Sequence, residues 1–188
     1  MTFQYFFFDT YPGYFLQVLP IALIVSSVYG IIRFKNKNES KTNILGSCMF
    51  VCYLTGLICL VVLKDVIGQF WYNLIYNLSD GGSSIRLFVW NANFTPNGPN
   101  PNQNININMN IVNNMKNNLL MFLPFGTLYP LHDKHTTLKK TILVGIVLIL
   151  IIEFLQPIFG RSFDINDIIL NSLGVILSSF VFNNIIKK

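Results

Sequence analysis

Residues 153–171, EFLQPIFGRSFDINDIILN, join two long apolar runs and hold three of the eight acidic residues of the chain. Glu153 closes the run before this stretch, and Asp164 and Asp167 open the run after it. Apolar runs of this length are typical of membrane-spanning helices, in which a carboxylate costs about 2.5–3.5 kcal/mol of insertion free energy. The acids in this stretch therefore mark a candidate functional site.

The composition is that of a membrane protein. The chain has 188 residues, of which 52% are hydrophobic and 11% charged, whereas soluble domains carry roughly 25% charged residues. The net charge of +5 does not indicate a nucleic-acid partner, because the positive residues sit beside apolar runs and form no aromatic-interleaved patch. The three cysteines share one apolar run, where small buried side chains are expected rather than disulfides or metal ligands.

Five apolar segments predict an all-α transmembrane fold, because each can be made long enough to cross a hydrocarbon core of about 30 Å. The segments are residues 14–32, 44–63, 118–131, 141–156 and 165–182. The third carries Pro124, Gly126 and Pro130, so we expect a kinked or short span that extends back to Ile111. Residues 1–13 are aromatic and suit the headgroup region.

The chain then divides into two N-terminal spans (1–63), a long polar connection (64–117) and a three-span core (118–188). In the connection, apolar residues from Ile67 to Leu78 recur at helical spacing, which predicts an amphipathic helix at the membrane interface.

Two further segments of this connection resemble strands. Residues 85–90 are apolar, and residues 104–111 alternate Asn with Ile or Met at period two. This pattern favours a small hairpin across the TPNGPNPNQ turn, and an Asn-rich disordered loop is the alternative.

The distribution of basic residues predicts the orientation in the membrane. Nine basic residues lie in the first loop, the third loop and the C-terminal tail, against four in the N-terminus, the long connection and the fourth loop. By the positive-inside rule, the N-terminus and residues 64–117 lie outside and the C-terminus is cytoplasmic. The candidate site then lies at the outer face, and the two histidines fall in the inner basic loop.

The last predicted helix carries a polar stripe. Asp164 and Asp167 have the spacing of a helix-capping motif. At 100° per residue, Asp164, Asp167, Asn171, Gly174 and Ser178 share about a quarter of the helical circumference. Such a stripe faces protein rather than lipid, so it predicts either a packing seam held by hydrogen bonds or a site built on that seam.

The preceding helix contributes Glu153 and Gln156 from one face, and the Pro157–Gly160 segment turns the chain back into a helical hairpin. Arg161 lies at the tip of this hairpin. Its guanidinium group can pair with one of the nearby acids, or it can hold an anionic headgroup or a sugar phosphate. The spacing Asp-x-x-Asp-x-x-x-Asn is a weak metal signal, so we expect no metal and no cofactor.

These motifs resemble the VanZ-like membrane proteins of Gram-positive bacteria. The family pattern is Asn-x-x-x-Phe-x-Pro-Phe-Gly, then Glu-x-x-Gln, then Arg-x-x-Asp-x-x-Asp-x-x-x-Asn-x-x-Gly. The matching residues are Asn118, Phe122, Pro124, Phe125, Gly126, Glu153, Gln156, Arg161, Asp164, Asp167, Asn171 and Gly174. The resemblance covers residues 118–182, whereas residues 1–117 share only two spans and an external connection. Ser178 departs from the pattern, because members often have a second Gly there.

The resemblance implies a role in the cell envelope, since the namesake is associated with low-level resistance to teicoplanin, a lipid-bearing glycopeptide that acts on cell-wall precursors. The expected partners are membrane lipid and a lipid-linked wall precursor or the lipoglycopeptide itself. The polar cluster expected to bind it comprises Glu153, Gln156, Arg161, Asp164, Asp167 and Asn171, with Asn118, Pro124, Gly126 and Gly174 in support.

Two alternatives remain open. The first is a small intramembrane enzyme acting on a lipid headgroup, with Glu153 as general base and Arg161 as phosphate clamp. Ser162 is the nucleophile that the outer motif offers, and the sequence places no histidine on that side to activate it, which favours binding over catalysis. The second is a structural or assembly partner that uses the same residues only to pack.

Overall fold

The computed structural model describes residues 2–35, 40–76, 92–94 and 105–186. Within these ranges, four helices are long and apolar enough to cross a membrane, over Tyr11–Phe34, Lys41–Val61, Leu138–Phe159 and Ile165–Asn184. This confirms the all-α transmembrane fold. The predicted third span lies within one longer helix, Ile105–His132, whose composition is more polar. A total of five spans therefore stays a prediction.

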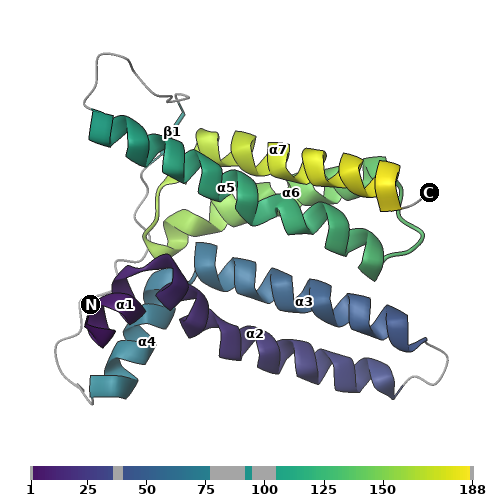
Figure 1. Ribbon diagram of the computed structural model, residues 1–188, viewed down its shortest axis with the longest axis horizontal. Helices are drawn as coiled ribbons and strands as arrows, with labels where there is room; N and C mark the ends of the chain where they lie inside the picture. Colours follow the sequence, from purple (N-terminus) through teal and green to yellow (C-terminus); the bar gives the residue numbers. More distant parts are fainter. Residues whose placement is uncertain (1, 36–39, 77–91, 95–104, 187–188) are drawn as a thin grey trace. The chain divides into compact units, whose positions relative to one another are not determined.

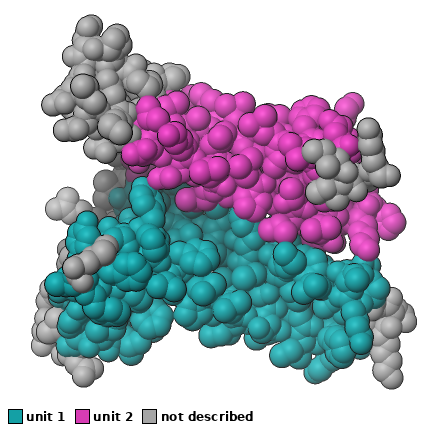
Figure 2. Space-filling view, viewed as in Figure 1, with its two compact units in different colours: residues 1–90, 155–161 teal, residues 91–154, 162–188 magenta. Residues whose placement is uncertain are grey.

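The chain forms two compact units (Figure 2). Unit 1 contains residues 1–90 and 155–161, and unit 2 contains residues 91–154 and 162–188. The predicted division into residues 1–63, 64–117 and 118–188 follows membrane topology instead, and it stays a prediction.

Unit 1 is built on the helices α2 (Tyr11–Phe34) and α3 (Lys41–Val61), which lie side by side (Figure 1). Thr10 caps α2 by accepting from the Gly13 amide at 3.3 Å, and Ser40 caps α3 in the same way. Where the two helices meet, the Ser26 hydroxyl donates to the Cys48 carbonyl at 2.8 Å. The three cysteines, all on α3, are free thiols.

Two short helices flank this pair. The aromatic N-terminal segment forms α1 (Phe3–Asp9), and the predicted amphipathic segment forms α4 (Lys64–Tyr76). They pack through aromatic rings, with the Phe7 and Trp71 centroids 6.0 Å apart. The Trp71 indole also donates to the carbonyl of the buried Gln17 at 2.9 Å. The helix predicted in this region is confirmed, and its position at the interface stays a prediction.

Unit 2 consists of α5 (Ile105–His132), α6 (Leu138–Leu155) and α7 (Ile165–Val181), with α5 and α7 side by side (Figure 1). Its core includes Phe122, Ile149 and Val175, each fully buried. Gly145 of α6 packs against this core, since a Cβ added there would lie 2.6 Å from a Val175 methyl group. The glycine thus allows α6 to approach α7 closely.

The strand predicted over residues 104–111 is wrong, because residues 105–111 form the first turns of α5. Period-two alternation is a weak signal, and here a long helix satisfies the backbone hydrogen bonds instead. The segments 85–90 and 95–103, the rest of the expected hairpin, lie outside the described residues. A short parallel pairing does form between β1 (Ala92–Asn93) and β2 (Phe163–Asp164), with Ala92 opposite Phe163.

The predicted reversal after α6 is confirmed. The chain passes from α6 into a 3₁₀ turn, η1 (Gln156–Phe159), and then to Gly160, whose φ of 84° lies in the left-handed region. A residue with a side chain is strained there. The Arg161 amide closes the turn by donating to the Gln156 carbonyl at 3.0 Å. At the other end of α7, the chain continues into a π-helical turn, η2 (Phe182–Ile186).

Candidate functional site

Asp164 begins α7 and has the predicted capping role. Its backbone is extended, with φ −132° and ψ 122°, and its Oδ1 accepts from the Asn166 amide at 2.9 Å. An N-cap of this kind contributes about 0.5–2 kcal/mol to helix stability. A structural role therefore accounts for this acid, although its second oxygen remains available to other donors.

The β1–β2 pairing brings Asn93 against Asp164. The side-chain amide of Asn93 lies 3.4 Å and 3.5 Å from the two carboxylate oxygens of Asp164. The Asp164 amide in turn points to Oε2 of Glu153 at 3.5 Å, the upper limit of a hydrogen bond. Glu153 is fully buried. Two acids from different helices are thus joined through the strand that precedes α7.

Asp167 lies one turn further along α7 and contacts α5 rather than its own backbone. The side-chain amide of Asn118 donates a hydrogen bond to Oδ1 of Asp167. The acid also lies in the first turn of α7, where the positive end of the helix dipole favours a negative charge. The predicted supporting residue Asn118 is therefore a direct partner of a predicted site residue.

Asn171 continues the stripe and is 4% exposed. Its Oδ1 has no hydrogen-bond partner among the described residues. Leaving such an acceptor buried without a donor costs about 1–3 kcal/mol. A ligand or a water molecule bearing a donor would remove that cost.

The remaining stripe residues pack α7 onto α5. A Cβ on Gly174 would overlap the Leu119 carbonyl, and a Cβ on Gly126 would overlap the Ser178 hydroxyl. Ser178 bonds back to the Gly174 carbonyl at 2.8 Å. Pro124, also predicted as support, lies within α5, where its carbonyl accepts from Thr127 at 2.9 Å. The stripe faces protein, and its small residues set the distance between the helices.

Gln156 and Arg161 belong to unit 1. Gln156 is buried at the start of η1. The Arg161 guanidinium donates through Nη1 to the Val61 carbonyl at 2.6 Å, at the end of α3. Contact of either residue with the acids of unit 2 stays a prediction.

The polar cluster of unit 2 comprises Glu153, Asp164, Asp167 and Asn171, with Asn93 and Asn118 as partners of the two aspartates. In the described ranges, no group of three or more His, Cys, Asp or Glu side chains is arranged to hold a metal. Ionised carboxylates only accept hydrogen bonds, so the acids suit a ligand rich in O–H and N–H groups.

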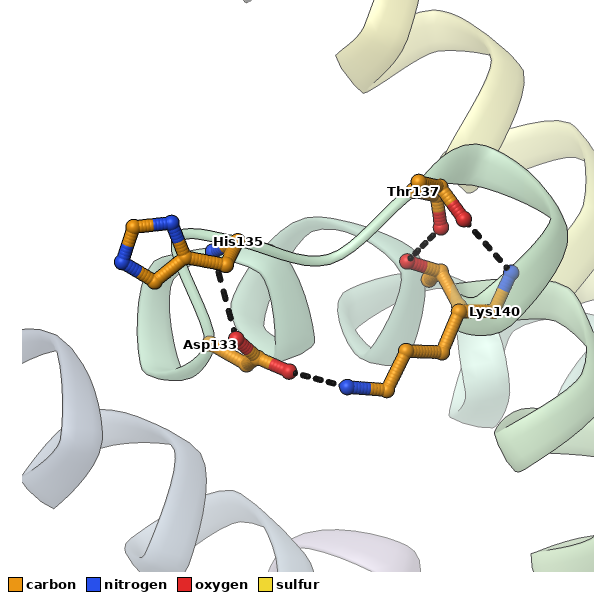
Figure 3. Close-up of polar contacts among 5 residues, drawn as sticks. Asp133, His135, Thr137 and Lys140 are labelled. Carbon is orange, nitrogen blue, oxygen red and sulfur yellow. Dashed lines mark hydrogen bonds and ion pairs between the residues drawn. The ribbon is translucent and has the colours of Figure 1, made fainter.

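The loop between α5 and α6 forms a separate polar network (Figure 3). Lys140 pairs with Asp133 at 2.7 Å, and the His135 amide donates to Asp133 at 3.2 Å, while the His135 ring points away. The Lys140 hydrogen bond holds the pKa of Asp133 below its usual value. Thr137 caps α6 by accepting from the Lys140 amide at 3.3 Å. This network stabilises the loop.

Sequence reasoning missed Asn93. It lies 71 positions before its partner Asp164, and no local spacing relates the two residues. The predicted hairpin paired residues 85–90 with residues 104–111, whereas the short strand that contains Asn93 pairs with Phe163–Asp164.

The membrane-spanning helices, the buried Glu153 and the half-buried Asp164 and Asp167 define an all-α membrane protein with a polar cluster inside a helical unit. The sequence model of the VanZ/LLP1 family matches residues 50–187, more than half of the chain, and the protein belongs to this family. The matched range contains every residue of the predicted cluster. No curated protein and no solved structure matches the chain.

Proposed function

We propose that the protein is a cell-membrane VanZ-like protein that protects against lipid-bearing glycopeptides of the teicoplanin type. In this proposal, the polar cluster of unit 2 binds a lipid-linked wall precursor, or the drug itself, at the outer face of the membrane. The observation that carries the proposal is the gathering of Glu153, Asp164 and Asp167 with Asn93 and Asn118.

The chemistry of both ligands supports this assignment. A glycopeptide and a wall precursor both present sugar hydroxyls and amide N–H groups. These groups can donate hydrogen bonds to carboxylate and amide oxygens. The buried Oδ1 of Asn171 adds an acceptor one turn beyond Asp167. Acids within membrane-spanning segments are costly and commonly serve function.

Packing alone explains only part of the cluster. Gly126, Gly174 and Ser178 account for the close approach of α5 and α7, and Asp164 is accounted for as a helix cap. Neither explanation requires the carboxylates of Glu153 and Asp167. These two acids therefore carry the functional proposal.

Binding is favoured over hydrolysis by the distance between Ser162 and the histidines. The histidines, at positions 132 and 135, precede α6, and Ser162 follows it. α6 has 18 residues, which at 1.5 Å per residue is about 27 Å. No described histidine is thus in reach of Ser162 to activate it.

Asp167→Asn tests the proposal, because the variant keeps an oxygen that can accept from Asn118 and removes the charge. We expect loss of protection against teicoplanin in a susceptibility assay, with normal accumulation in the membrane. Glu153→Gln should behave in the same way. Asp133→Asn is the matched control, since its acid lies in the separate loop network, and it should protect like the parent.

If Asp167→Asn and Glu153→Gln both protect like the parent, the proposal is wrong and the cluster is a packing seam. If they fail to accumulate while Asp133→Asn does, the charges serve folding rather than ligand binding.

A further inference from the structure

Two positive charges meet at the end of α3 in unit 1. The Arg161 guanidinium is held there by its hydrogen bond to the carbonyl of Val61, the last residue of α3. Lys64 lies three residues later and begins α4. Both side chains are half-buried.

Lys64 lies over an aromatic ring of α2. Its Nζ is 3.8 Å from the centroid of the Tyr14 ring, within the range of a cation–π interaction. Burial holds the pKa of Lys64 below its usual value, and the positive charge of Arg161 lowers it further, while the exposed Asp65 opposes the shift. Arg161, bonded to the Val61 carbonyl, and Lys64, three residues further along the chain, thus bring two positive charges to the same end of α3.

The carbonyl groups at the end of α3 account for the position of Arg161 but not for that of Lys64. The last carbonyls of a helix lack partners within the helix, and Arg161 satisfies one of them. That bond uses one of the five N–H groups of the guanidinium. The second cation, Lys64, adds repulsion and desolvation, which a bound anion would offset.

We propose that Lys64 and Arg161 together bind the phosphate group of a membrane lipid at the end of α3. The guanidinium fork and the ammonium group are the two side-chain types that bind phosphate best. Of the two roles that the sequence leaves open for Arg161, this inference selects the anionic headgroup.

The position of the pair supports a lipid rather than a soluble phosphate. α3 is apolar enough to cross a membrane and ends at Val61, so the cations lie at headgroup depth. The adjoining α4 contributes Trp71 and Tyr72, which pack on Phe rings of α1, and Trp and Tyr are enriched at membrane interfaces. The inference goes beyond the proposed function, because it concerns unit 1 and does not involve the acids of unit 2.

Native mass spectrometry of the purified full chain in non-ionic detergent tests this site. The probes are farnesyl diphosphate, dioleoyl phosphatidic acid, farnesol and inorganic pyrophosphate. We expect both lipid phosphates to bind and farnesol and pyrophosphate to bind at least about tenfold more weakly. Tighter binding of farnesyl diphosphate would identify the ligand as a lipid-linked diphosphate. Tighter binding of phosphatidic acid would identify it as a phospholipid headgroup.

Lys64→Gln should weaken binding of the lipid phosphates about tenfold or more, because one charge-assisted contact is lost. Lys140→Gln is the matched control and should bind like the parent, since that lysine pairs with Asp133 at a different loop. Arg161→Gln should also weaken binding. If the glutamine variant loses the α3 contact and unfolds, Lys64→Gln tests the site, and Arg161→Lys, which keeps the charge, should still bind.

Two results would overturn the inference. One is parental affinity for lipid phosphates in both Lys64→Gln and Arg161→Gln, because the pair would then only stabilise the helix end. The other is equal binding of pyrophosphate and farnesyl diphosphate, because the lipid would then be irrelevant. Asp167→Asn should keep lipid-phosphate binding, so failure of this site and failure of the proposed function give different results.

Discussion

Asp164 and Asp167 are three residues apart at the start of α7, and the structure gives them different partners. Asp164 bonds to the backbone of its own helix, whereas Asp167 accepts from Asn118 of α5. The first contact could be predicted because capping depends on local spacing. The second depends on which helix packs alongside α7, and periodicity alone does not determine that neighbour.

Asp133 provides a test of electrostatics at the residue scale. Its folded-state pKa is lowered chiefly by the hydrogen bond from Lys140. A depressed acid pKa means that the pair stabilises the loop above the unfolded-state value, near 3.9, and that this contribution is lost as the pH falls through the folded-state pKa. We expect the Asp133 carboxyl carbon to titrate below the ordinary range of an aspartate in an NMR titration in micelles.

Lys140→Gln is the comparison for this titration. Removing the donor should return the Asp133 midpoint toward its ordinary value, with little effect on overall stability because the Lys140 side chain is 53% exposed and solvent weakens the ion pair. Equal midpoints in the parent and the variant would show that the ion pair does not persist in solution.

At the scale of elements, helices and their ends follow from local sequence. The last span was predicted over residues 165–182 and is observed over Ile165–Val181, and the reversal at Gly160 was predicted from Pro and Gly. Residues 105–111 could not be assigned this way, because alternating Asn and Ile carries little intrinsic preference and the long helix α5 prevails. The β1–β2 pairing is a long-range contact without a local signal.

Gly174 tests the packing of α5 on α7. A methyl group at this position would overlap the Leu119 backbone carbonyl, which no side-chain rotation can relieve. We expect Gly174→Ala to cost roughly 1–3 kcal/mol of stability, measured by thermal unfolding in detergent.

Gly56→Ala is the matched control for this substitution. Its added methyl group would lie 4.0 Å from the Ala22 Cβ, an ordinary contact. Since alanine favours helix over glycine, this variant should unfold at the parental temperature or above. A Gly174→Ala variant that unfolds like Gly56→Ala would mean that α5 and α7 are further apart.

For the whole molecule, the orientation depends on whether α5 crosses the membrane. Four helices meet the length and composition of a span, and α5 contains the fifth span that the sequence predicts and on which the charge count is based. If α5 crosses, residue 135 and the C-terminus lie inside and residue 102 lies outside. If it does not, residues 102 and 135 lie on the same side.

Cysteine labelling of intact cells decides between these topologies. Single cysteines at positions 102, 135 and 188, in a chain without Cys48, Cys52 and Cys59, should react with an impermeant reagent only at position 102. Labelling at 135 as well would show that α5 does not cross, and labelling at 188 would invert the orientation of the candidate site.

The most direct test of the functional account is ligand binding to the purified full chain. Isothermal titration calorimetry with teicoplanin and with a lipid-linked wall precursor should detect binding of at least one of them. That binding should be weakened about tenfold or more in Glu153→Gln and Asp167→Asn, and unchanged in Asp133→Asn. Binding of neither ligand, or equal affinity in the parent and the two cluster variants, would contradict the account.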